Sequence, residues 1–146
     1  MYKRVLLCYE GTATDRSAQL QGSELLLLLG AEAHVLSVAP AMSFGQTAAI
    51  MAGGACTAHE AEVQRYAEQM AEQLRRRGIR AFAHVACHAI DQIPDFARQL
   101  GCDLIIIGHR SRSSLGRWWA GPDKFALAER SPCSILIAID GTCSSN

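Results

Sequence analysis

The stretch Asp103-Leu104-Ile105-Ile106-Ile107-Gly108 decides the fold of this chain. Four consecutive aliphatic residues between an acidic residue and a glycine are typical of a short strand that is buried on both faces. Such strands occur in parallel sheets whose two faces are covered by helices. Similar apolar runs, which predict further strands, lie at residues 5–9, 33–39, 79–86 and 134–139.

Helical patterns fill the intervals between these runs. The clearest pattern repeats apolar residues every three or four positions from Val63 to Leu74, and Gly78 follows as a helix-ending residue. Gly30 and Gly101 stand in the same way after two further patterns. The other predicted helices cover residues 14–29, 93–100 and 123–129.

Two local features complete this outline. We expect Asp91 to cap the helix over residues 93–100, with Pro94 in the first turn, where its missing N–H costs nothing. Residues 40–57 show no periodicity and are small and apolar. They predict a long loop that is either functional or disordered, and we expect residues 41–57 to be mobile or poorly ordered when no ligand is bound.

Strands alternating with helices predict one α/β domain. The chain has 146 residues, of which 49% are hydrophobic and 19% charged, and this composition excludes a disordered or fibrous protein. We expect an open, doubly wound, Rossmann-like sheet of five parallel strands with helices on both faces, over residues 1–140. Residues 141–146 form a polar tail. Ligands of such sheets bind beyond the carboxyl ends of the strands.

Charge and hydropathy exclude several partners. Fourteen basic residues balance fourteen acidic ones, so no net charge attracts nucleic acid or an anionic membrane. The longest apolar run, residues 25–29, is far shorter than the ~20 residues that a bilayer span needs. The first ten residues have no room for the apolar region of a signal peptide. We therefore expect a cytoplasmic protein.

Neither a metal site nor a catalytic set is predicted. The six cysteines include no C-x-x-C pair, and Cys8, Cys102 and Cys133 lie in or beside apolar runs, so reduced, structural thiols are expected. The five histidines form no ligand pair on one helix face. Ser113 and Ser114 have no identifiable His–Asp partners and no G-x-S-x-G turn.

Two predicted strand ends carry unusual chemistry. The first ends in Glu10-Gly11. The second opens a segment from Gly108 to Lys124 that is rich in glycine, serine and arginine and leads into a helix. Backbone N–H groups, a helix N-terminus and arginine side chains are the groups that bind phosphate. From composition alone, a solvated basic loop is an equally good interpretation.

Several motifs resemble those of the universal stress proteins. That family carries G-x-x-G-x(9)-G-(S/T) after its fourth strand, and Gly108, Ser111 and Gly121 keep this spacing. The run of residues 103–108 resembles the family's D-L-I strand, and Ser131-Pro132-Cys133 resembles the start of its closing A-P-C-P-V-L-V strand. The resemblance covers residues 2–139 and implies the strand order 3-2-1-4-5.

The resemblance also implies a function. Nucleotide-binding members hold ATP or another adenine nucleotide and act as small regulatory modules of the stress response, without turnover as their main purpose. The base is expected near the ends of the first and second strands, and the ribose and phosphates along the glycine-rich loop. The implied site comprises Glu10, Gly11, Val38, Ala39, Gly108, Arg110, Ser111, Arg112, Gly121, Pro122, Asp123 and Lys124.

Four positions depart from the family pattern. Glu10 replaces an aspartate and Ser111 replaces a glycine. Pro122 replaces Ser or Thr, which removes a hydroxyl and a backbone N–H from the phosphate, and Asp123 adds a carboxylate at the same place. These changes favour AMP or ADP over a tightly held ATP. Two alternatives stay open: a member that works through dimerisation and protein partners without nucleotide, and a slow nucleotide hydrolase.

The last predicted strand indicates how the chain assembles. Residues 134–139 are apolar, with no lysine and no internal proline, and an edge strand of this kind must be covered to prevent aggregation. In the family, this strand commonly pairs antiparallel with its copy in a second subunit. We therefore expect a homodimer through Ser134–Ile139.

Overall fold

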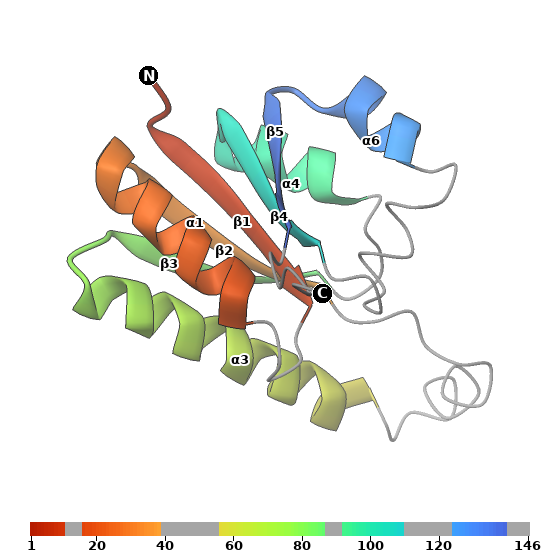
Figure 1. Ribbon diagram of the computed structural model, residues 1–146. Coiled ribbons are helices and arrows are strands. Elements are labelled where there is room, and N and C mark those ends of the chain that lie inside the picture. The colour runs from red at the N-terminus through yellow and green to blue at the C-terminus, as the bar shows by residue number, and fades with distance from the viewer. Residues whose placement is uncertain (11–15, 39–55, 87–91, 110–123, 140–146) are drawn as a thin grey trace, which may run out of the picture.

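The computed structural model describes residues 1–10, 16–38, 56–86, 92–109 and 124–139 (Figure 1). Its strands are β1 (Arg4–Glu10), β2 (Glu32–Val38), β3 (Ala81–Ala86), β4 (Leu104–His109) and β5 (Ser134–Ile139). Its helices are α1 (Arg16–Leu29), α3 (Cys56–Arg76), α4 (Ile93–Leu100) and α6 (Lys124–Arg130).

The five strands form one parallel sheet in the order β3-β2-β1-β4-β5. The predicted open, doubly wound sheet with order 3-2-1-4-5 is therefore confirmed. β1 lies at the centre, between β2 and β4, and its seven residues pair in register with all seven of β2, from Arg4 opposite Glu32 to Glu10 opposite Val38. β5 pairs with β4 over its whole length and forms one edge.

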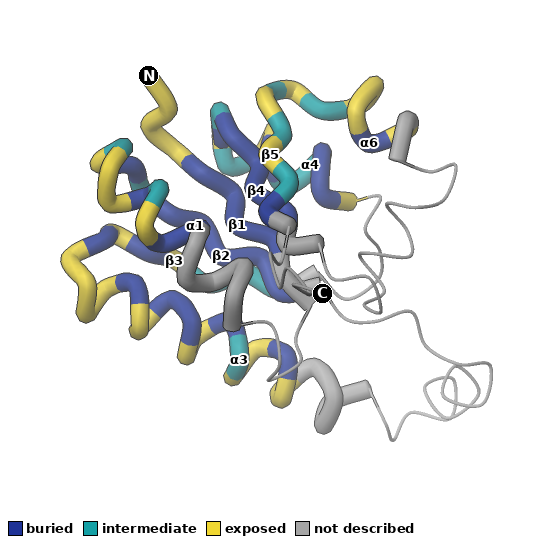
Figure 2. The backbone as a smooth tube through the Cα atoms, in the orientation of Figure 1, coloured by how far each residue is buried: buried dark blue, intermediate teal, exposed yellow. Residues whose placement is uncertain are grey.

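Alternating side chains of the central strand divide the core into two layers. Val5 and Leu7 pack toward α1 and α3, whereas Leu6 and Cys8 pack toward α4 and α6. All four side chains are buried. In Figure 2 the central strands β1, β2 and β4 are mostly dark blue, and exposed yellow segments lie on the outer sides of the helices. The sequence of β1, apolar at every one of these positions, thus requires helices on both faces.

Helix α3 buries one side and leaves the other in solvent. The buried residues repeat at helical spacing, as the sequence predicts, and Tyr66 beside them is partly buried. α3 begins at Cys56, so the last two residues of the predicted loop over residues 40–57 are helical. The first turns contain no apolar repeat, and periodicity therefore could not show where the helix begins. The buried residues of α3 are Val63, Ala67, Met70, Ala71 and Leu74.

Helix ends were predicted better at the C-terminus than at the N-terminus. The glycines that follow α1, α3 and α4 all have positive φ, which a glycine adopts without strain. In α4 the N-cap is Gln92 rather than the expected Asp91, and the side chain of Gln92 makes no capping hydrogen bond. Pro94 lies in the first turn, as expected. Asp91 itself and residues 41–55 lie outside the described residues.

Of the five strands, only β5 has both of its predicted boundaries, and each of the others differs by one or two residues at one end or both. β3 begins at Ala81 rather than Ile79, because the Ile79 N–H donates to the carbonyl of Leu74 and completes the end of α3. Glu10 belongs to β1 instead of the following turn, since it pairs with Val38. Within the described ranges, no helix is both long enough and apolar enough to cross a membrane.

Candidate functional site

The candidate site lies where the chain changes direction across the sheet. From β1 the chain moves through α1 to β2 on one side, and later it enters β4 on the other side. In doubly wound folds, ligands bind at this switch point, outside the carboxyl ends of the strands. The candidate site is therefore the carboxyl edge around the end of β1.

The register brings the predicted residues of three strands to this edge. Glu10 and Val38 are paired as the last residues of β1 and β2. Cys8 pairs with Ile107 across β1 and β4, so Gly108, the next residue of β4, lies beside the end of β1. Three residues that the sequence analysis assigned to one site, on the first, second and fourth strands, therefore lie at the same end of the sheet.

The rest of the predicted set is only partly described. Lys124 is the first residue of α6. The remaining predicted residues, Gly11, Ala39, Arg110, Ser111, Arg112, Gly121, Pro122 and Asp123, lie outside the described residues.

A buried hydroxyl beside this edge was missed by sequence reasoning. Ser37, one residue before the end of β2, is fully buried, and its Oγ atom has no hydrogen-bond partner among the described residues. Alternation along β2 places it on the same face as Ala33 and Val35, toward α1 and α3. A buried hydroxyl without a partner costs about 1–3 kcal/mol. No sequence pattern marks Ser37 as a buried hydroxyl, because serine occurs commonly in strands.

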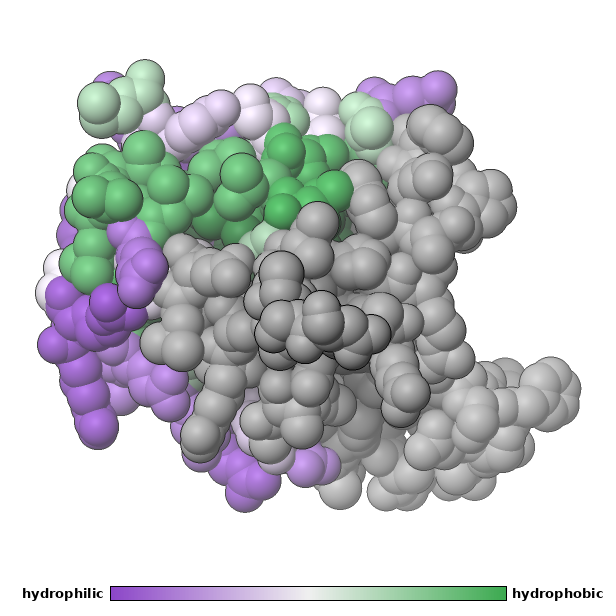
Figure 3. Space-filling view, viewed as in Figure 1, coloured by the Kyte–Doolittle hydropathy of each residue, from purple (hydrophilic) through white to green (hydrophobic). Residues whose placement is uncertain are grey.

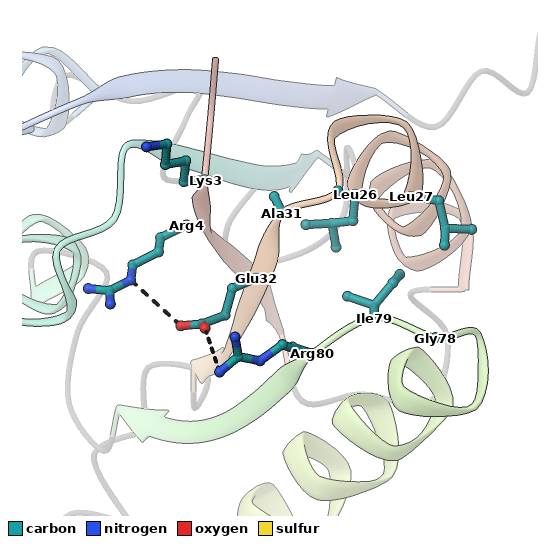
Figure 4. Close-up of a pocket in the computed structure, with 10 residues that line it drawn as sticks. Lys3, Arg4, Leu26, Leu27, Ala31, Glu32, Gly78, Ile79 and Arg80 are labelled. Carbon is teal, nitrogen blue, oxygen red and sulfur yellow. Dashed lines mark ion pairs between the residues drawn. The ribbon is translucent and has the colours of Figure 1, made fainter.

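A pocket of about 430 Å³ lies at the amino ends of the strands, opposite the carboxyl ends that form the candidate site (Figure 4). Glu32 points between two arginines there, with Oε1 3.7 Å from Nε of Arg4 and Oε2 3.5 Å from Nη2 of Arg80. Leu26, Leu27 and Ile79 form its apolar wall. Since the pocket surrounds the amino ends of β1 and β2, it is distinct from the predicted nucleotide site.

Glu32 also begins a hydrogen-bonded chain across the sheet. Its Oε1 lies 2.9 Å from Nε2 of His34, and Nδ1 of His34 lies 3.0 Å from Nε2 of His84. The register of β2 and β3 places the two histidines diagonally on one face. Periodicity along the chain could not reveal this contact, because the residues are 50 positions apart. In the described ranges, no group of three side chains could hold a metal ion.

Three cysteines lie in or against the core: Cys8 and Cys102 are buried and Cys133 is partly buried. Cys8, Cys102 and Cys133 are free thiols in or against the α4/α6 core layer. Burial raises the pKa of Cys102 to about 12 and also raises the pKa values of Cys8 and Cys133. Since the thiolate is the nucleophile and the metal ligand, the raised pKa values make these thiols less reactive near neutral pH than an ordinary cysteine. Their predicted role as small hydrophobic residues is confirmed.

Known proteins with this architecture were found among solved structures. The hypothetical protein MJ0577 superposes with a TM-score of 0.74 at 18% identity, over 95% of this chain and 96% of its own. UspA from Lactobacillus plantarum gives 0.69 at 15% identity, over 94% and 97%. The universal stress protein from Archaeoglobus fulgidus in complex with dAMP gives 0.58 at 14% identity, over 94% and 97%.

These identities by themselves establish a shared fold. No curated protein sequence matches the chain significantly. The sequence model of the universal stress protein family, however, matches residues 1–138, nearly the whole chain. The chain therefore belongs to the universal stress protein family.

Proposed function

We propose that this chain is a regulatory module that binds an adenine nucleotide at the carboxyl edge of its sheet. One observation carries the proposal: the ends of β1, β2 and β4 meet at the switch point, with Glu10 paired to Val38 and Gly108 beside them. Two structural neighbours are universal stress proteins solved with cAMP and with dAMP. Their ligands support an adenine nucleotide as the class to test first.

The proposed position of the base follows from the first two strands. The carboxylate of Glu10 accepts hydrogen bonds from the base or the ribose, and it reaches one methylene further than the aspartate of the family pattern. The backbone of Val38 and Ala39 lies beside the base. The ribose meets the backbone of Gly108 and Ser111.

The phosphates extend toward Gly121 and the start of α6. Pro122 has no backbone N–H and no hydroxyl to donate to a phosphate oxygen, and Asp123 is negatively charged. The phosphate end of the site therefore binds a triphosphate weakly. Arg110, Arg112 and Lys124 supply the positive charge that the smaller ligands need. AMP or ADP is the proposed ligand in preference to ATP.

Native mass spectrometry of the gently purified, untagged chain, followed by calorimetry with AMP, ADP and ATP, tests this function. The expected result is one bound adenine nucleotide per chain, with AMP or ADP binding more tightly than ATP. Gly121→Val should abolish binding because its side chain blocks the approach of the phosphate. Gly116→Val changes a glycine of the same segment outside the motif and should retain binding. Failure of all three nucleotides to bind at millimolar concentration would leave the partner-only function.

The proposal includes a homodimer through β5. This strand has a neighbour on one side only, and Leu136 in its middle is 42% exposed. Figure 3 shows hydrophobic surface gathered over the C-terminal part of α1 and over β5. Antiparallel pairing of two β5 strands would satisfy the unpaired backbone groups and cover Leu136.

A cytoplasmic location is also proposed, since the free thiols Cys8, Cys102 and Cys133 suit a reducing compartment.

A further inference from the structure

Glu32, His34 and His84 form a chain of hydrogen bonds, here called the histidine chain, that lies outside the proposed nucleotide site. The carboxylate and the first imidazole are 2.9 Å apart, and the two imidazoles are 3.0 Å apart. His34 is buried, and Phe82 stacks on its ring at 5.2 Å between centroids. The histidine chain therefore ties β2 to β3, the strand at the other edge of the sheet from β5.

The two imidazoles meet edge to edge. Their centroids are 5.2 Å apart while the facing nitrogens are 3.0 Å apart, so those nitrogens lie between the two rings. Each lone pair or N–H therefore points at the other ring. This geometry suits one N–H···N hydrogen bond and leaves no room for a cation between the nitrogens.

Counting protons shows what the histidine chain can hold. With both imidazoles neutral, His34 donates from Nε2 to Glu32 and accepts at Nδ1 from His84. One added proton is accommodated on His34, which then donates from both nitrogens, to Glu32 and to Nε2 of His84. A second proton, on His84, would set two N–H groups against each other at 3.0 Å. The contact survives one protonation but not two.

The charged surroundings favour a single added proton. Arg4 of β1 lies 3.7 Å from Glu32, and Arg80, directly before β3, lies 3.5 Å from it. The carboxylate of Glu32, 18% exposed, thus faces two guanidinium groups as well as His34. Burial and the charge of His34 lower the pKa of His84 below its ordinary value. Burial and the charge of His34 both oppose a second positive charge on the two histidines.

We propose that the histidine chain is a pH-sensitive latch on the β3 edge of the sheet. It holds while at most one of its imidazoles is protonated. When acid protonates both, His84 separates from His34 and the carboxyl half of β3 loosens. Phe82, in the amino half of β3, keeps its contact with the ring of His34. The latch requires no nucleotide, so its test is independent of the proposed ligand site.

Nitrogen-15 NMR of the imidazoles in the untagged chain, titrated from about pH 8 to about pH 4.5, tests the latch. The expected result is a coupled pair, with the second protonation well below the ordinary value of about 6.5. Amide hydrogen exchange in residues 84–86, corrected for intrinsic rates, should become at least tenfold faster with that second step. Two histidines that titrate independently near 6.5, with unchanged protection of β3, would overturn the proposal.

Two matched variants separate the latch from general acid sensitivity. His84→Gln removes one of the two titrating imidazoles. The amide exchange of β3 in this variant should therefore not become faster at the pH of the second protonation in the parent chain. His59→Gln removes a histidine of α3 and should behave as the parent chain does. If the β3 amides of the parent chain and of His84→Gln lose protection from hydrogen exchange equally as the pH falls, the latch is contradicted. Should His84→Gln fail to fold, the tautomers and titration of the parent chain still decide the question.

Discussion

Asp103 and Arg4 join β4 to β1 through two hydrogen bonds that run in opposite directions. The Arg4 N–H donates to Oδ1 of Asp103 at 3.0 Å, and the Asp103 N–H donates to the Arg4 carbonyl at 2.9 Å. The Lys3 N–H donates to Oδ2 at 2.8 Å. These bonds set the register at the amino edge, and that register determines which residues meet at the carboxyl edge. The acidic residue that opens the strand motif thus helps to form the candidate site from the far end of the sheet.

Asp103→Ala should lower the free energy of unfolding by about 1–3 kcal/mol, because two backbone N–H groups lose their acceptor. Urea denaturation of the parent and the variant measures this difference. Asp95→Ala is the matched control, since Asp95 forms exposed ion pairs with Arg98 and Arg130. Such pairs contribute about 0–1 kcal/mol. Equal losses in the two variants would contradict the assigned role of Asp103.

Ser37→Ala should leave stability unchanged or raise it by up to about 1 kcal/mol. The hydroxyl of Ser37 is buried and has no hydrogen-bond partner in the part of the chain that the structure describes, so its removal ends a desolvation cost without breaking a described bond. Ser23→Ala is the control, because the hydroxyl of the buried Ser23 accepts a hydrogen bond from Arg77. Denaturation curves should show a loss for Ser23→Ala alone. A clear loss for Ser37→Ala would mean that its hydroxyl is paired in solution.

Sequence periodicity predicted the order, type and core faces of the elements, because these depend on local repeats. The buried set Val63, Met70 and Leu74 follows directly from helical spacing. Boundaries were less accurate where pairing or capping decides them. Glu10 looked like a turn residue before a glycine, yet pairing with Val38 extends the strand through it.

In the site regions too, some positions could be predicted from the sequence and others could not. The position of Glu10, Val38 and Gly108 at the same end of the sheet could be predicted, since the resemblance supplied the strand order and the carboxyl ends of parallel strands meet there. The contact between His34 and His84 could not, because it depends on the relative register of two strands 50 residues apart. Sequence patterns describe neighbours along the chain, whereas this contact is made across it.

Leu136→Lys should weaken the proposed dimer by at least tenfold. A charged side chain in the middle of an edge strand opposes pairing with a second copy. Light scattering at micromolar concentration should give a dimer mass for the parent chain and a mass nearer the monomer for the variant. Gln73→Lys adds the same positive charge at an exposed position of α3, which packs against β2 and β3 away from β5, and it should leave the dimer intact. A monomer mass for the parent chain would refute the proposed assembly.

The stability of the parent chain should fall as the pH drops from about 7 to about 5. Burial and the charge of His34 lower the pKa of His84 in the folded chain, so the unfolded chain binds more protons in this range. The contribution of His84 is fully present above the unfolded value of about 6.5 and is lost as the pH falls below it. His84→Gln should flatten this slope by up to about 1.4 kcal/mol per pH unit, as urea denaturation at several pH values would show. A slope unchanged by the substitution would contradict the shifted pKa.

Pro122→Ser should tighten ATP binding about tenfold or more. The substitution returns a backbone N–H and a hydroxyl to the place where the family motif carries Ser or Thr, and each is worth about 1–3 kcal/mol toward a charged acceptor. Since 1.4 kcal/mol corresponds to a factor of ten, one recovered bond accounts for the expected gain. Calorimetry with ATP and AMP separates this effect from a general gain, because AMP, whose phosphate chain is shorter, should gain less. Pro132→Ser, at the exposed proline before β5, controls for the loss of a proline elsewhere. Absence of ATP binding in both the parent chain and Pro122→Ser at millimolar ligand would exclude the glycine-rich segment as a phosphate site.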